Sequence, residues 1–331
     1  MNLRVMTLLV PLIFAGPALA WGPTGHQIVS SVGSTVATER QAPFWTANAD
    51  AMCTLSTVPD RIWKAPQTKP LEAPTHWFQA DAYISDLNQC SDLLAFPKSY
   101  DAAVKKYGQA TILKNGTAQW RINQLYTLAV SKFKTGDATT GLQLAGAMSH
   151  YIGDLSMPLH VSENYDGAST GNNGIHKYFE SENIRDESAI RSEVFKRAQV
   201  LLQDRAFLAE SSGDIYDIVT HEIIRSLQKR DEVLANDTKY GRSDAKGQAI
   251  QLNLAEDRMA DGAAVLSIIL ARMTNDAGLS TNSSVVPVRD PDFIKPDFSQ
   301  NPTRRMKVRT EFYSQVLTSS HLIDGADDCA E

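Results

Sequence analysis

Apolar residues recur every three or four positions through much of the chain, which is the period of an α-helix. The first such stretch runs from His26 to Val36. The same period continues over Trp120–Phe133, Leu142–Ile152, Ser188–Leu208, Asp214–Leu227 and Ala245–Met273. Runs that alternate apolar and polar residues between hairpin turns are absent. The pattern therefore predicts an all-α protein.

Two long stretches, residues 58–116 and 156–176, lack this period, and we expect them to form long functional loops. The sequence after Asn275 is rich in Ser, Asn, Pro and Asp. We therefore expect a single helical domain over residues 21–275, followed by a polar tail over 276–331 that is extended or loosely packed.

The first twenty residues have the features of a secretory signal. Arg4 gives a weak positive region, Val5–Ala15 is a short apolar run, and Ala18-Leu19-Ala20 is an A-x-A cleavage site. The apolar run is too short for a permanent membrane anchor. We expect a secreted or periplasmic protein whose mature chain begins at Trp21.

Three cysteines are present, so at least one is left over from any pairing within the chain. Export through an oxidising compartment favours a disulfide between Cys53 and Cys90, with Cys329 unpaired. Three free thiols are the alternative.

Composition adds two limits to this picture. The 331 residues are 43% hydrophobic and 21% charged, which is typical of a folded globular protein and excludes a disordered chain. The net charge of −6 gives no general attraction to duplex DNA or to anionic lipid. A phosphate substrate is still compatible with this charge, because bound metal cations reverse the local sign.

The most informative stretch runs from His150 to Glu180. His150 and Asp154 are four residues apart, so on a helix they share one face. Pro158 should end that helix, and His160 follows it. His176 and Glu180 repeat the same spacing. Imidazole and carboxylate groups together form a typical zinc ligand set. One such pair is more often a surface contact, but two pairs with a histidine between them are harder to attribute to chance.

Further candidate ligands lie upstream. Asp60 and His76 both lie in loop-like sequence. Together with the segment Trp21-Gly-Pro-Thr-Gly-His26, they complete a pattern that resembles the zinc-dependent phospholipase C and S-one/P-one nuclease superfamily. Motifs carry this resemblance from Trp21 to about Glu180, and only helical character and length carry it beyond.

The resemblance implies a single, mostly helical domain with three bound Zn²⁺ ions. The first ion would take the amine and carbonyl oxygen of Trp21 together with His26 and Asp154. The second would take Asp60, His76, His150 and, through a bridge, Asp154 again. The third would take His160, His176 and Glu180.

This ligand set suits hydrolysis of a phosphodiester. The positive field of three zinc ions exceeds the charge of their carboxylate ligands and would stabilise a phosphodiester transition state. Asp60 is the expected proton acceptor as well as a ligand. Arg61 or Lys64 could donate hydrogen bonds to phosphate oxygens, although a solvated loop charge is an equal alternative for each.

The choice of phosphodiester depends on weaker signals. Trp77 follows His76 where the nuclease branch has a base-stacking aromatic, and Asn172 and Asn173 faintly resemble a base-pocket segment. Simple packing and a Gly/Asn turn are the alternatives. Against this, His176-x3-Glu180 departs from the nuclease pattern and resembles phospholipase C. We expect a nuclease that prefers single-stranded DNA or RNA, with 3′-nucleotidase activity as a further option. The alternative is a phospholipase C that acts on phosphatidylcholine-like lipids.

Two readings without catalysis also stay open: a periplasmic zinc-binding protein without turnover, and a helical scaffold whose ligands serve only folding. For partners, we expect a nucleic acid, nucleotide or phospholipid head group as substrate and a monomer without a stable membrane anchor.

Overall fold

A computed structural model describes residues 21–36, 43–279 and 282–299. Within these ranges every regular element is a helix and no residue lies in a β-strand, so the all-α prediction is confirmed. The expected signal segment and Cys329 lie outside the described residues. Over the described part of the chain, no helix combines the length and apolar character needed to cross a bilayer.

The helices that build the core include all those expected from periodicity. They are α1 (Pro23–Thr35), α7 (Ala118–Lys134), α8 (Ala138–Ser156), α10 (Glu187–Leu201), α12 (Ile215–Leu227) and α14 (Ala245–Ala277). The remaining α-helices are shorter: α2 (Pro43–Ala47), α3 (Ala49–Leu55), α4 (Lys69–Glu72), α5 (Tyr100–Tyr107), α6 (Gln109–Asn115), α9 (Ile175–Lys177), α11 (Arg205–Glu210) and α13 (Arg230–Tyr240). Short segments of 3₁₀- or π-helix occur at η1 (Pro59–Trp63), η2 (Ala73–His76), η3 (Ala80–Tyr83), η4 (Leu87–Ala95), η5 (Ala168–Thr170) and η6 (Tyr178–Glu182).

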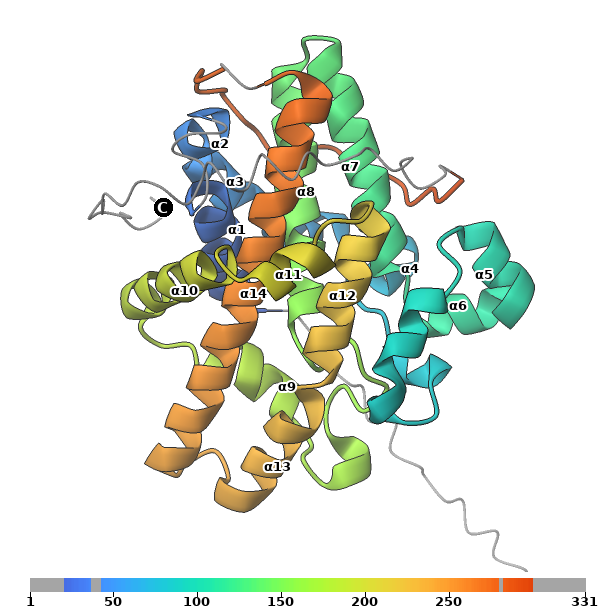
Figure 1. Ribbon diagram of the computed structural model, residues 1–331, viewed down its shortest axis with the longest axis vertical. Coiled ribbons are helices and arrows are strands. Elements are labelled where there is room, and N and C mark those ends of the chain that lie inside the picture. The colour runs from blue at the N-terminus through green and yellow to red at the C-terminus, as the bar shows by residue number, and fades with distance from the viewer. Residues whose placement is uncertain (1–20, 37–42, 280–281, 300–331) are drawn as a thin grey trace, which may run out of the picture.

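Helix α8 runs through the middle of the molecule. It contacts α1, α3, α7, α12 and α14, and the long α14 lies beside it (Figure 1). Asp137 begins α8 by accepting a hydrogen bond from the Thr140 amide at 3.1 Å, and Pro158 follows its C-terminal end. Nearly all of its side chains are buried, so polar groups on α8 are held in the protein interior.

Two expectations about helices need correction. The stretch 58–116 contains a series of short helices and helical turns instead of long loops, because its segments are too short to show a helical period. The expected helix Ser188–Leu208 is divided into α10 and α11. The division occurs at Asp204, whose carboxylate accepts hydrogen bonds from the amides of Ala206 and Phe207 and so starts a new helix.

The tail segment 282–299 is extended, and it is packed against the helical domain. Asn48 bonds the carbonyl of Ser284 and the amide of Val286, both at 2.8 Å. Farther along, the carbonyl of Ile294 accepts a hydrogen bond from Arg121 at 2.7 Å. This segment therefore covers the side of the domain that carries α3 and α7.

The expected disulfide between Cys53 and Cys90 is wrong, because Cys90 is a free, buried thiol in η4. Burial raises the pKa of this thiol. Cys53 lies on α3 and is not its partner.

Candidate metal centre

The central pair of the site comes from one face of α8. His150 and Asp154 are one helical turn apart and neither is exposed to solvent. The Asp154 Oδ2 atom lies 3.4 Å from His150 Nε2. Burial, together with the nearby carboxylates of Asp60, Glu180 and Glu72, raises the pKa of Asp154 well above its usual value.

Three groups of side chains around this pair are close enough to hold metal ions. Each group has its candidate ligand atoms within 4.8 Å of one another. The groups are His26, His150 and Asp154; Asp60, His76 and His150; and His160, His176 and Glu180. All eight side chains expected from the sequence are thus brought together, although they come from five separate segments.

The first group joins α1 to α8. The rings of His26 and His150 stack with centroids 3.8 Å apart. His26 Nε2 lies 3.5 Å from Asp154 Oδ1. Trp21, the ninth expected ligand, is beside this group: its buried indole donates to the Ser156 hydroxyl at 3.0 Å and contacts the Phe179 ring.

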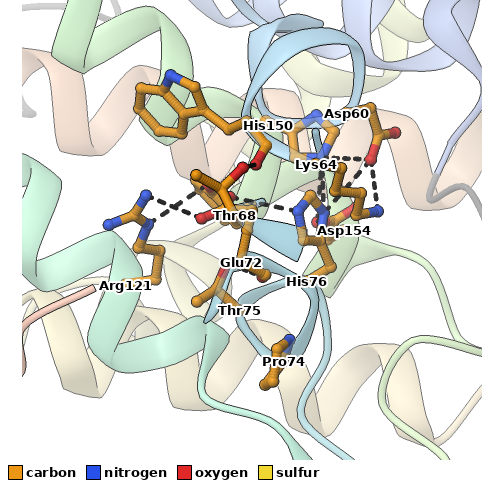
Figure 2. A network of polar contacts seen from close by, with 12 residues as sticks. Asp60, Lys64, Thr68, Glu72, Pro74, Thr75, His76, Arg121, His150 and Asp154 are labelled. Carbon is orange, nitrogen blue, oxygen red and sulfur yellow. Dashed lines mark hydrogen bonds and ion pairs between the residues drawn. The ribbon is translucent and has the colours of Figure 1, made fainter. Parts of the chain in front are cut away.

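The second group lies where η1 and η2 meet α8 (Figure 2). His76 Nδ1 is 3.1 Å from Asp154 Oδ2 and 2.9 Å from His150 Nε2. Asp60 Oδ1 is 3.7 Å from the nearest nitrogen of each of these two histidines. Asp60 is the most exposed member, with 15% of its side chain accessible, so this group lies nearest to solvent.

The third group forms just after α8. His160 Nε2 and His176 Nε2 are 3.1 Å apart, and Glu180 Oε2 is 3.0 Å from His176 Nε2. Burial raises the pKa of Glu180 to about 7. Burial disfavours the charged form of His176, but Glu180 outweighs this effect and the pKa of His176 is raised.

Backbone carbonyls fix the orientation of three of the histidines. In each case Nδ1 faces a carbonyl oxygen: Ser56 for His150, His76 for His160 and Tyr165 for His176, at 2.8, 2.5 and 2.9 Å. A carbonyl accepts only, so Nδ1 carries the proton and the Nε2 lone pair points into the group. The lone pairs of His160 and His176 therefore face each other, an arrangement that a cation between them would stabilise.

Burial also favours the neutral form of four of the five imidazoles. It lowers the pKa of His26, His76, His150 and His160 well below the usual value, and neighbouring positive groups add to this effect. Several buried atoms have no hydrogen-bond partner, among them both ring nitrogens of His26, both oxygens of Asp154 and Oε2 of Glu180. Neutral imidazoles and unpartnered carboxylate oxygens are the donors that zinc prefers, so these residues fit divalent zinc.

Of the two basic residues considered at the site, only Lys64 faces it. Its ammonium group lies 2.5 Å from Asp60 Oδ1 and is largely buried (Figure 2). Arg61 instead forms a two-pronged ion pair with Asp290 of the extended tail, at 3.0 and 2.6 Å. The structure therefore does not support Arg61 as a catalytic contact, because its guanidinium is engaged elsewhere.

The three residues expected to contact substrate lie in different environments. Trp77 is partly exposed next to His76, and its indole donates to the Lys114 carbonyl at 3.1 Å. The side-chain amide of Asn172 is buried and donates to Leu234, Asp237 and Thr238 of α13. Asn172 thus packs a loop against a helix, which is the alternative noted from the sequence. Asn173 is exposed, and its carbonyl accepts from Arg242 at 2.9 Å.

One contributing residue was missed. Glu72 is fully buried and lies 3.4 Å from His76 Nε2. It precedes His76 by four residues, the same spacing that identified the other two pairs. The signal was present, but residues 58–116 showed no helical period that would have placed Glu72 and His76 on one face.

Gly153 allows close packing within the first group. A Cβ atom at this position would lie 2.9 Å from His26 Nδ1. We expect Gly153→Ala to push His26 away from Asp154 and to weaken metal binding there. Gly141→Ala on the same helix is the control, since its Cβ would meet Phe133 at 2.8 Å. Both variants should lose about 1–3 kcal/mol of stability in thermal unfolding. Equal zinc content in the two would contradict the expectation.

Comparisons with known proteins give distant matches. No protein-family model matches the chain. A probable serine protease of Bradyrhizobium tropiciagri is 33% identical over 94 residues, which are 23% of this chain and 12% of that protein. This chain therefore corresponds to only a small part of that protease.

Two solved structures match most of this chain at low sequence identity. The alpha toxin of Clostridium absonum has a TM-score of 0.46 and 13% identity, over 81% of this chain and 66% of the toxin. The Clostridium perfringens alpha-toxin from an avian strain has a TM-score of 0.42 and 14% identity, over 80% of this chain and 64% of that toxin. At this distance the matches do not assign a family.

Proposed function

We propose that this protein is a zinc-dependent phosphodiester hydrolase with a cluster of three metal ions. The observation that carries the proposal is the set of three adjacent ligand groups, two of which share His150. Shared ligands place two cations close together, and closely spaced cations act together on phosphate esters. The sequence resemblance described above supports the same reaction class.

The ligand numbers favour catalysis over a purely structural metal site. Structural zinc sites fill all four positions with protein ligands, whereas catalytic sites leave a position open. Each group here offers three side chains, and Asp60 is partly exposed. Water and substrate could therefore reach the second group.

Zinc, when bound, lowers the pKa of water to about 7 and neutralises charge on phosphate oxygens. The protein's own residues supply the remaining functions. The carboxylate of Asp60 could accept a proton at the solvent-facing side. Lys64, held beside it, could donate hydrogen bonds to a phosphate oxygen. The buried carbonyl contacts of His150, His160 and His176 keep their rings fixed while this happens.

A phospholipid substrate is now better supported than a nucleic acid. The side-chain amide of Asn172 is hydrogen-bonded to Asp237 of α13, so one residue of the expected base pocket is engaged elsewhere. Glu180 belongs to the third group, and glutamate at this position is the feature that resembles phospholipase C. Trp77, partly exposed beside His76, is the residue that still favours stacking on a nucleotide base.

A substrate panel on mature, zinc-loaded protein tests the proposal. The panel should hold phosphatidylcholine, single-stranded DNA, RNA, duplex DNA and 3′-nucleotides. We expect hydrolysis of at least one phosphodiester, loss of turnover after chelation, and recovery when zinc is restored. Zinc content near three per chain, measured by elemental analysis, is the expected stoichiometry.

The alternatives give different results in the same experiment. Zinc binding without turnover on any substrate would indicate a zinc-binding protein, and activity that survives chelation would assign the ligands a folding role only. Preference for single-stranded nucleic acid over phosphatidylcholine would restore the nuclease reading.

A further inference from the structure

A buried carboxylate lies directly behind the second ligand group. Glu72 is the last residue of α4 and has no solvent exposure. Removing a carboxylate from water is costly unless it is paired and hydrogen-bonded. Its Oε2 accepts a hydrogen bond from Arg121 Nη2 at 3.1 Å, and its Oε1 accepts from the Tyr151 hydroxyl. Figure 2 shows Glu72 between Arg121 and His76.

His76 differs from His150, His160 and His176 in the group that faces the ring nitrogen directed away from the cluster. Nδ1 of His150, His160 and His176 faces a backbone carbonyl. His76 Nε2 makes no hydrogen bond, and it lies at an ion-pair distance of 3.4 Å from Glu72 Oε1. A proton on Nε2, facing the carboxylate, leaves the lone pair on Nδ1. That nitrogen points at Asp154 and His150.

We propose that Glu72 is a positioning residue that holds His76 with its Nδ1 lone pair toward the metal cluster; this inference rests on the proposed function. A carboxylate behind a ligating imidazole fixes the tautomer and the ring orientation and makes the ligand more basic. Glu72 itself touches neither substrate nor metal and acts only through His76.

The carboxylate is in turn fixed from two directions. Arg121 comes from α7 and Tyr151 from α8. Arg121 also donates to the Ile294 carbonyl at 2.7 Å and to Gln124 Oε1 at 2.8 Å. Gln124 in turn donates to the Lys295 carbonyl at 2.8 Å. The extended tail is therefore connected to the second ligand group through Arg121 and Glu72.

Glu72→Gln tests the inference, because it keeps the side-chain volume and removes the charge. Zinc affinity should be measured on mature protein by competition with a chromophoric chelator. Loss of such a partner lowers metal affinity by about 10–100-fold. We expect this loss at one or two ions, while the ion held by His160, His176 and Glu180 keeps its affinity.

Two further variants separate positioning from folding. Glu72→Gln leaves Arg121 buried without its anion, so the double variant Glu72→Gln/Arg121→Gln removes the whole ion pair and should recover stability. Its zinc affinity should stay low if Glu72 positions His76, and should recover with stability if the role is only structural. Glu222→Gln, another fully buried carboxyl on α12, is the matched control and should bind zinc normally.

Failure of the inference and failure of the proposed function would give different zinc-binding results. Wild-type protein that binds no zinc would contradict the proposed function. Wild-type protein that binds zinc normally, together with a Glu72→Gln variant of unchanged affinity, would overturn only the role of Glu72. The same loss in Glu222→Gln would also overturn it.

Discussion

Replacing Asp154 with asparagine should remove about two of the three zinc ions and lower turnover by roughly a thousandfold. Asp154 lies within 3.5 Å of one nitrogen on each of His26, His76 and His150. It is thus the only carboxylate among the described residues placed between the first two ligand groups. Losing about 4 kcal/mol of metal-dependent stabilisation of the transition state corresponds to this change in rate.

The metal-free form provides the control for Asp154→Asn. Both oxygens of Asp154 lack hydrogen-bond partners, so an uncharged amide of equal size should leave the metal-free protein as stable as before or make it more stable. Glu180→Gln is the matched variant. It should cost one ion, because Glu180 belongs to the third group alone. Equal zinc loss in the two variants would argue against a bridging role for Asp154.

Keeping a methionine before Trp21 should sharply reduce activity at limiting zinc. We propose that the mature chain begins at Trp21 and that its amine is a zinc ligand. The first residues are anchored beside the cluster: the Gly22 amide donates to the Glu180 carbonyl at 3.2 Å, and a Cβ on Gly153 would approach both His26 and Trp21. A preceding residue would turn the amine into an amide, which has no basic lone pair to bind a metal.

Comparing cleaved and Met-extended protein tests this expectation. The extended form should fold normally, because packing of the helices supplies most of its stability. Zinc content should fall by about one ion per chain, since His26 and Asp154 would remain as weaker ligands. A protease-removable extension is the control, because cleavage should restore both zinc and turnover. Full zinc and full activity in the extended form would show that the amine is not a ligand.

The sequence by itself was enough to identify the helical class and most of the candidate ligands. A spacing of four residues has a local geometric meaning on a helix, so His150 with Asp154 and His176 with Glu180 could be paired before any fold was known. Long helices such as α14 also show their period directly, because one face is buried along their whole length.

Other features were decided only by the tertiary structure. Contacts between distant segments pair Arg61 with Asp290, commit Asn172 to α13 and leave Cys90 without a disulfide. Local spacing carries no information about such contacts, because they depend on how separately formed helices pack. Glu72 combines both kinds of information. Its spacing from His76 is visible in the sequence, but its proposed role requires Arg121, Tyr151 and the tail to be brought together by the fold. The energetic effect and the role of a buried charge depend on the partners that the fold places around it.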